Sequence, residues 1–324
     1  MQKPIAVLVV ALSLMVTSLT VVAQDYPSRP VRIIIGYAPG GLGDLLARML
    51  AEKLTPRLGQ PVIVENRVGS GGTIAADVVA KAAADGYTLL QGTAAETTYA
   101  PSTVGARLPY DPARDFAPIT LLNVAQMVLV VHPSTGFTSV RDLVDYAKAN
   151  PGRLNYASFG NGSSSHFAAE LFKAAAAIDM VHIPYKGSGP AVQETMAGRV
   201  QLLFDTVASS AQHVRAGRLV ALAVTGNTRA NFLPQVPLLK EVGFAAVELQ
   251  PWAGLFAPAG TPPAVIQRLN REVREVLLSA EISDRLNALG AGPAPGTPEE
   301  LAAHVRAEII RVGRVVEGAK LKFD

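Results

Sequence analysis

The stretch "IIIGYAPGGLGDLLARML", residues 33–50, joins an apolar strand to a helix through a short turn rich in Gly and Pro. A junction of this kind exposes backbone N–H groups around a small concave surface, and the helix N-terminus adds partial positive charge. The helical part places Leu46, Leu50 and Leu54 on one face. The stretch therefore predicts an α/β unit that can bind an anionic group where its strand ends.

Strand and helix patterns alternate on both sides of this stretch. The first half continues with a strand at 61–67, a helix opened by "GSGG" at 69–72 and a strand at 87–93. The rhythm restarts near residue 126 and runs to "LVALAVTG" at 219–226. Such alternation predicts parallel sheets with helices on both faces. We therefore expect two α/β lobes.

Cap signals mark the starts of several helices. Ser139 and Asp142 form a capping pair before an amphipathic segment, and Thr297 and Glu300 form another near the C-terminus. Thr261 is expected to cap a helix whose first residue is Pro262. The last two of these starts predict a C-terminal helical return after the second lobe.

Composition narrows the possible functions. Hydrophobic residues make up 49% of the 324-residue chain and charged residues 17%, so a large core is available and disorder is not expected. The formal charge is only +3 and no basic run occurs, which argues against a nucleic-acid partner. Cysteine is absent, which excludes disulfides, zinc–thiolate sites and a lipid anchor on cysteine. The five histidines lack metal-site spacing, so we predict no metal site.

The N-terminus has the pattern of a secretory signal. Lys3 precedes a long apolar segment, and Val21 and Ala23 occupy the small-residue positions of a cleavage site. We predict a signal peptide over residues 1–23, cleaved after Ala23, and export of the mature chain, which the family resemblance described below places in the periplasm. An uncleaved membrane anchor is the alternative, because the segment is just long enough to span a bilayer.

A second loop resembles the opening one in composition. The stretch "YASFGNGSSSHF" at 156–167 again ends a strand, frees the backbone with glycines and opens a helix with serines. Ligands of open α/β sheets bind at the carboxyl ends of the strands. Two such loops, one in each lobe, predict a clamp for a small carboxylate. An ordinary connection capped by Asp44 and a dinucleotide site are the alternatives, and Leu46 stands where the dinucleotide motif needs a third glycine.

Catalytic patterns are weak. Ser163, Ser164 and Ser165 lack a nucleophile-elbow motif, and His166 follows them too closely on the expected helix to deprotonate them. Asp205 ends an apolar strand and either faces the cleft or caps a helix. Lys186 either pairs with an anionic ligand or lies exposed in its loop. We therefore expect a binding protein rather than an enzyme.

The order of several motifs along residues 25–324 resembles the Bug family, the periplasmic substrate-binding proteins of tripartite tricarboxylate transporters. The motifs are "YPSRPVRIIIGYAPGGLGD", "LGQPVIVENRVGSGGTIAADVVAKAAADGYTLL", "LPYDPARDFAPIT", "LNYASFGNGSSSHFAAELFK", "MVHIPYKGSGPAV", "VQLLFD" and "LFAPAGTPP". The resemblance implies a type II periplasmic binding fold with crossing hinge strands and a ligand cleft. It assigns residues 25–122 and 230–324 to the first lobe and residues 123–229 to the second.

The resemblance also implies a function and a set of ligand-binding residues. A monomeric receptor would capture a small carboxylate without catalysis or cofactor and deliver it to membrane transporter subunits. A receptor that feeds a sensor protein and, with less support, a secreted serine hydrolase are the alternatives. The family's two loops, with weaker positions for the far end of the ligand, correspond here to Tyr37, Ala38, Gly40, Gly41, Leu42, Asp44, Ser158, Gly160, Gly162, Ser163, Ser164, Tyr185, Lys186 and Asp205.

Two positions depart from the family pattern and bear on the ligand. Leu42 and Gly43 stand where the family has a small residue followed by a hydroxyl or amide residue, which adds apolar bulk and removes a donor. Glu96 lies in the loop after "YTLLQGT". If Glu96 faces the cleft, it disfavours a second carboxylate and favours an amine or hydroxyl. If it points to solvent, it has no role.

Overall fold

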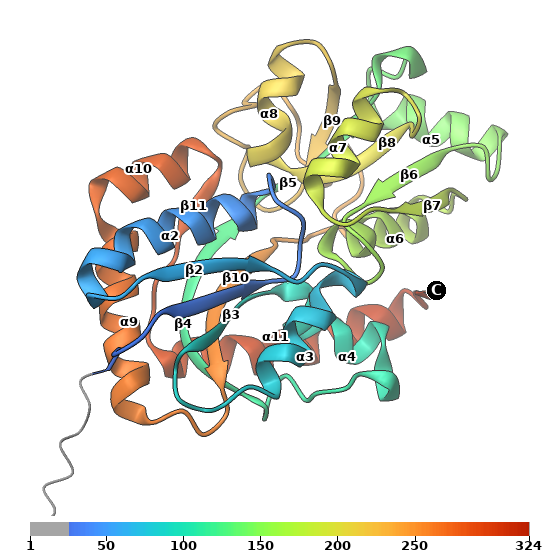
Figure 1. Ribbon diagram of the computed structural model, residues 1–324. Coiled ribbons are helices and arrows are strands. Elements are labelled where there is room, and N and C mark those ends of the chain that lie inside the picture. Colours follow the sequence, from blue (N-terminus) through green and yellow to red (C-terminus); the bar gives the residue numbers. More distant parts are fainter. Residues whose placement is uncertain (1–25, 324) are drawn as a thin grey trace, which may run out of the picture.

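The computed structural model describes residues 26–323, which form two β-sheets flanked by helices (Figure 1). The predicted signal peptide and its cleavage after Ala23 lie outside the described residues. The strand order of the first sheet is β11-β4-β10-β3-β1-β2. Its strands are β1 (Val31–Ile35), β2 (Val62–Asn66), β3 (Thr88–Thr93), β4 (Phe116–Ala125), β10 (Trp252–Pro258) and β11 (Ala291–Pro293).

The second sheet has the order β7-β6-β8-β5-β9. Its strands are β5 (Met127–Val131), β6 (Asn155–Ser158), β7 (Val181–Pro184), β8 (Leu202–Thr206) and β9 (Val220–Val224). β6 pairs in parallel with β7 and β8, whereas β5 runs antiparallel to β8 and β9. The predicted parallel sheets are therefore mixed, because the strands that arrive from the other lobe run in the opposite direction.

The chain crosses between the two sheets twice. Only Gln126 separates β4 from β5, and the return runs from β9 to β10. β10 then lies antiparallel between β3 and β4, with Trp252 opposite Val124. These crossing strands join the lobes, as predicted.

Helices cover both faces of each sheet, and the alternation of side chains along the strands explains how. Ile33 and Ile35 of β1 face a core formed with α2 (Leu42–Leu58), α9 (Pro263–Leu278) and α10 (Ala280–Ala288). Ile34 faces the opposite core, with α3 (Thr73–Ala80) and α11 (Pro298–Gly318). In the second lobe, α5 (Val140–Ala149) and α6 (Ser164–Ala176) cover one face, and α7 (Ser188–Met196) and α8 (Val207–Arg215) cover the other.

The predicted caps at α5 and α11 are confirmed as reciprocal capping boxes. The start of α9 was wrong by one residue: the helix begins at Pro263, and Pro262 occupies the cap position. Thr261 instead donates its hydroxyl proton to the carbonyl of Pro258, 2.8 Å away, and so closes the turn after β10.

The predicted boundary at residue 230, where the chain returns to the first lobe, can be compared with the packing of the core. Ala230, Leu233, Val236 and Leu238 belong to the same buried cluster as Val128 of β5 in the second sheet. This packing favours a boundary that keeps residues 230–238 with the second lobe.

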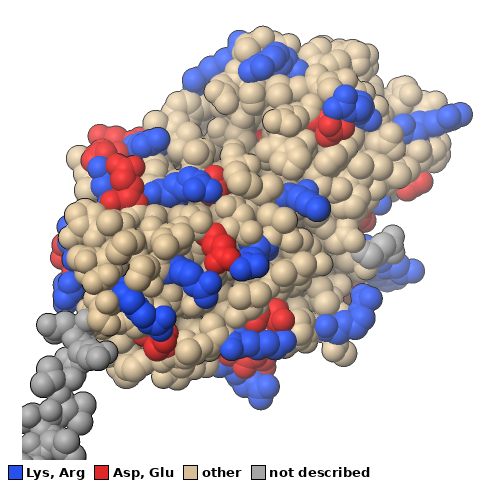
Figure 2. Space-filling view, viewed as in Figure 1, with Lys and Arg blue, Asp and Glu red and all other residues tan. Residues whose placement is uncertain are grey.

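The surface carries charges of both signs. Blue and red side chains are interspersed over the visible face, and neither sign forms a large patch there (Figure 2). Within residues 26–323, no helix combines the length and the apolar character needed to cross a membrane.

Candidate functional site

A cavity of about 90 Å³ lies between the two lobes. Its first-lobe walls come from the loop between β1 and α2, from β3 and from the hinge ends of β4 and β10. Its second-lobe walls come from α6, α7 and the loops after β6 and β8. The lining residues are Tyr37, Ala38, Gly41, Leu42, Gly43, Asp44, Thr93, Asn123, Ala125, Phe159, Ser164, Ser188, Thr206, Pro251, Trp252 and Ala253.

The opening loop places the N-terminus of α2 at this cavity. Gly41 is the cap residue of the helix, with an extended backbone and no side-chain hydrogen bond. The first amides of a helix have no partner within the helix, so they are available to an acceptor. Of the predicted ligand residues, Tyr37, Ala38, Gly41, Leu42, Asp44 and Ser164 line the cavity. Gly40 lies outside it, in a neighbouring groove.

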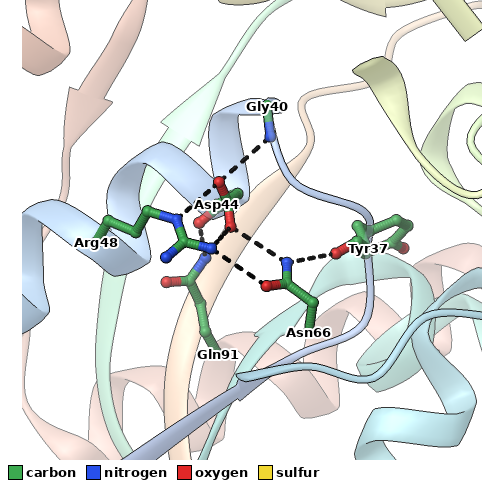
Figure 3. A network of polar contacts seen from close by, with 7 residues as sticks. Tyr37, Gly40, Asp44, Arg48, Asn66 and Gln91 are labelled. Carbon is green, nitrogen blue, oxygen red and sulfur yellow. Dashed lines mark hydrogen bonds and ion pairs between the residues drawn. The ribbon is translucent and has the colours of Figure 1, made fainter. Parts of the chain in front are cut away.

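The carboxylate of Asp44 is occupied by its own loop (Figure 3). Its Oδ1 accepts from Arg48 at 2.9 Å and from Asn66 at 3.1 Å, and its Oδ2 accepts from the Gly40 amide at 3.2 Å. Asn66 also donates to the Tyr37 carbonyl, 2.9 Å away. Burial acts to raise the pKa of Asp44, but these hydrogen bonds outweigh it and leave that pKa below its usual value. Asp44 therefore positions the loop.

The predicted second loop shapes the N-terminus of α6 but lines little of the cavity. Ser163 caps this helix by accepting from the His166 amide, and the hydroxyl of Ser158 contacts His182 Nε2 at 2.5 Å. Gly160 and Gly162 adopt positive φ angles of 121° and 73°. None of these four predicted ligand residues lines the cavity, whereas Ser164 in the first turn of α6 does.

The three positions predicted for the far end of the ligand do not line the cavity either. Tyr185 is held by its backbone amide, which donates to the Ser158 carbonyl at 3.0 Å. The carbonyl of Lys186 accepts from the Ala38 amide of the first lobe at 2.8 Å. Asp205 is fully buried, and its carboxylate accepts from Ser188 at 2.8 Å and from Ser210 at 2.6 Å.

The sequence predicted that Asp205 either faces the cleft or caps the following helix. In the structure it does neither, because it does not line the cavity and does not cap α8. The cap of α8 is Thr206, whose hydroxyl accepts from the Ser209 amide. Burial raises the pKa of Asp205 to about 6. Asp205 therefore acts behind the cavity wall, through Ser188.

Glu96 lies behind the opposite wall. It is completely buried within the π-helix η2 (Ala95–Tyr99), so the solvent-facing alternative was wrong. Its Oε1 accepts from the Thr93 amide at 2.7 Å, and its Oε2 accepts from the Thr93 hydroxyl at 2.5 Å. A Cβ atom on Gly72 would lie 2.7 Å from Oε2, so only glycine fits there. Burial raises the pKa of Glu96 to about 7.

The serines beside His166 are engaged in structural contacts. Ser165 donates to the Phe204 carbonyl at 2.6 Å, and His166 Nδ1 accepts from the Gly162 amide at 3.1 Å. Burial lowers the pKa of His166 to about 4. Within residues 26–323, no histidine lines the cavity. The Nδ1 atom of His166 is occupied by a backbone amide.

Sequence reasoning missed the floor of the cavity. Asn123, Ala125, Pro251, Trp252 and Ala253 come from the hinge ends of β4 and β10. These strands are adjacent in the sheet but far apart in the chain, so no local pattern relates them. Only the single tryptophan, in "QPWAGLF" before the return strand, gave a usable signal.

The lobes touch each other around the cavity. The Ala38 amide bonds to Lys186 across the gap, and Gly71 packs so closely that an added Cβ would lie 2.3 Å from the Asn161 carbonyl. Tyr99 of the first lobe stacks on Phe167 of α6, with ring centroids 4.6 Å apart. The cavity is therefore bounded by an interface between the lobes.

Comparisons with known proteins bear on this arrangement. The family model "Tripartite tricarboxylate transporter family receptor" matches residues 46–321. "Protein BugT" of Bordetella pertussis (strain Tohama I) is 40% identical over 308 residues, which cover 93% of this chain and 93% of that protein.

Two solved structures are similar over nearly the whole chain. One, described as "R. palustris Rpa4515 with adipate", has a TM-score of 0.88 and 36% identity and covers 92% of this chain and 99% of its own. The other, "MatC (Rpa3494) from Rhodopseudomonas palustris with bound malate", has a TM-score of 0.86 and 32% identity and covers 90% and 100%. These likenesses confirm the predicted periplasmic binding fold.

Proposed function

Because the chain belongs to the tripartite tricarboxylate transporter receptor family, also called the Bug family, we propose that it captures a small carboxylate between its lobes and delivers it to membrane transporter subunits. The observation that carries this proposal is the cavity itself, which takes walls from both lobes and lies at the N-termini of α2 and α6. The relatives with bound adipate and malate support a carboxylate ligand.

Neutral donors hold the ligand carboxylate. The first-turn amides of α2 and α6 point partial positive charge at an acceptor, and the Ser164 hydroxyl and the Asn123 amide line the same cavity. Several charge-assisted hydrogen bonds in a site that excludes water support micromolar binding, on the order of −8 kcal/mol. The ligand shifts the equilibrium between the open and the closed state only through contacts with both lobes that exist in the closed state.

The proposal includes the cellular context. The chain works as a periplasmic receptor, as a monomer, without a cofactor and without catalysis of its own. The family description as a receptor supports the receptor role.

The single tryptophan offers a direct test. Trp252 is only 3% exposed and lines the cavity, so we expect its emission to change saturably when a ligand binds. Mature protein that has been unfolded and refolded to remove carried-over ligand is titrated with mono-, di- and tricarboxylates, amino acids and aromatic acids. Emission and melting temperature are followed together.

A Trp252→Phe variant is the control for the optical signal. It should lose the emission change and still show a higher melting temperature with the same compound. If no compound changes either readout while the protein melts cooperatively, the ligand is not a simple carboxylate and the proposal fails.

A further inference from the structure

The wall of the cavity contains no basic side chain. Among residues 26–323, no Lys, Arg or His lines it. Arg48 lies further along α2, and its guanidinium donates to the Asp44 carboxylate in hydrogen bonds of 2.9 and 3.0 Å. A ligand carboxylate can use the amides of the helix N-termini, but a second carboxylate would find no counter-charge.

Two buried carboxylates lie directly behind the wall, one in each lobe. Glu96 lies behind Thr93, and Asp205 lies behind Ser188. Both are fully buried, and within the described part of the chain neither has a basic side chain within ion-pair distance. A buried charge without a partner is unfavourable, so a cation in the cavity would offset it.

Three of the hydroxyls that line the cavity have their protons engaged within the protein, which decides what they can offer to a ligand. A hydroxyl has one proton, so a hydroxyl that donates inward offers only lone pairs to a ligand. Thr93 donates to Glu96 at 2.5 Å, and Ser188 donates to Asp205 at 2.8 Å. Tyr37 likewise donates to the Gly71 carbonyl at 2.8 Å. Thr93 Oγ1 also accepts from the Ala95 amide at 3.3 Å, so it has one lone pair left for a ligand. These three hydroxyls can therefore only accept from a ligand, and they favour a ligand that carries a donor.

The rest of the wall is apolar and the space is small. Leu42, Ala125, Phe159 and Trp252 supply hydrocarbon and aromatic surface. A volume of about 90 Å³ has room for roughly six to nine non-hydrogen atoms, if each takes the space that one water needs. The ligand therefore has a compact apolar body.

We propose that the ligand is a small apolar amino acid, with its carboxylate at the N-termini of α2 and α6 and its ammonium group at the acceptor hydroxyls of Thr93 and Ser188. The apolar side chain packs among Leu42, Phe159 and Trp252. This assignment rests on the proposed function, since it names the class of carboxylate that the receptor captures.

The test compares ligands that share one carbon skeleton. Valine, 2-hydroxyisovalerate and isovalerate differ only in carrying an ammonium, a hydroxyl or a hydrogen at one carbon. Calorimetric titration of the refolded protein near pH 8, above the pKa of about 7 for Glu96 and about 6 for Asp205, should show valine binding at least about tenfold more tightly than either of the others. Malate and adipate, with a second carboxylate, should bind at least about tenfold more weakly than valine.

The Glu96→Gln variant removes the buried charge and keeps the shape of the side chain. In Glu96→Gln, the amide oxygen still accepts from the Thr93 amide, and its NH₂ donates to the Thr93 hydroxyl. The Thr93 proton then turns outward, so the preference for valine over isovalerate should fall at least about fivefold. Glu52→Gln is the matched control, because Glu52 is exposed at the surface and should leave the preference unchanged.

The outcomes distinguish the two proposals. If isovalerate or 2-hydroxyisovalerate binds as tightly as valine, or if a dicarboxylate binds more tightly, the amino-acid assignment is overturned and the receptor function stands. If no carboxylate of any class binds, the proposed function itself fails. Should Glu96→Gln not fold, Asp205→Asn makes the same change behind Ser188.

Discussion

Replacing Gly71 with alanine should weaken ligand binding by at least about a hundredfold, or about 2.7 kcal/mol. The added Cβ would lie 2.3 Å from the Asn161 carbonyl and 3.1 Å from the Ser163 amide, both in the second lobe. Backbone atoms cannot swing aside as the end of a side chain can, so the lobes must separate. A ligand that needs both walls then loses the contacts that only the closed state supplies.

Gly105→Ala is the matched control for this substitution. Gly71 has a φ of 60° and Gly105 a φ of 62°, so alanine meets the same backbone strain at both positions. No atom lies within 4 Å of a Cβ at Gly105, whereas Gly71 faces the other lobe. Both variants should lose stability in urea unfolding from the same backbone strain, with a further loss at Gly71→Ala from the separated lobes, and only Gly71→Ala should lose affinity in calorimetry. Equal affinities would show that contact at Gly71 is not required for binding.

Much of the fold could be predicted from the sequence because its cues are local. The apolar strand before Gly41, the capping boxes at Ser139 and Thr297 and the alternation of strands and helices each act within a few residues. Local propensity and global fold agree in these segments. The direction of β5 was missed, because it depends on how the chain returns from the other lobe.

The candidate site was predictable only where a loop forms it. Tyr37, Gly41 and Leu42 belong to one conspicuous turn and line the cavity. Asn123 and Trp252 line it because two hinge strands pair, and that pairing leaves no local signal. The sequence also does not show whether an acidic side chain points into the cavity or lies behind its wall. Glu96 and Asp205 are therefore visible as candidates, but their positions behind Thr93 and Ser188 come from the structure alone.

The effect of Glu96 on stability should depend strongly on pH. Burial raises the pKa of Glu96 from 4.5 to about 7, so the folded state binds the proton more tightly than the unfolded chain does. Protonated Glu96 is therefore favourable for the fold at low pH, and that contribution is lost as the pH rises through the folded pKa. One pKa unit corresponds to about 1.4 kcal/mol, and ionisation of the folded state is only half complete at its pKa. The rise from pH 5 to pH 8 therefore removes roughly 2 to 3 kcal/mol, with the last part lost between pH 7 and pH 8.

Comparison with Glu96→Gln isolates this contribution from other titrating groups. His166 acts in the opposite direction, because burial lowers its pKa to about 4 and its neutral form becomes easier to maintain as the pH rises. That contribution is present in both proteins and cancels from their difference. Urea unfolding of the ligand-free proteins should therefore show the variant gaining roughly 2 to 3 kcal/mol on the parent between pH 5 and pH 8.

Glu52→Gln should change the unfolding free energy by the same small amount at both pH values, because Glu52 is exposed. If Glu96→Gln also shows a constant offset from the parent, then the Glu96 carboxyl keeps one protonation state in the folded and unfolded chain across this range. Its burial without a cation would then be stabilised by hydrogen bonds, of which those from Thr93 are the shortest. A gain that develops between pH 5 and pH 8 identifies Glu96 as a buried acid that ionises at a cost to the fold, which is the charge that an ammonium ligand would offset.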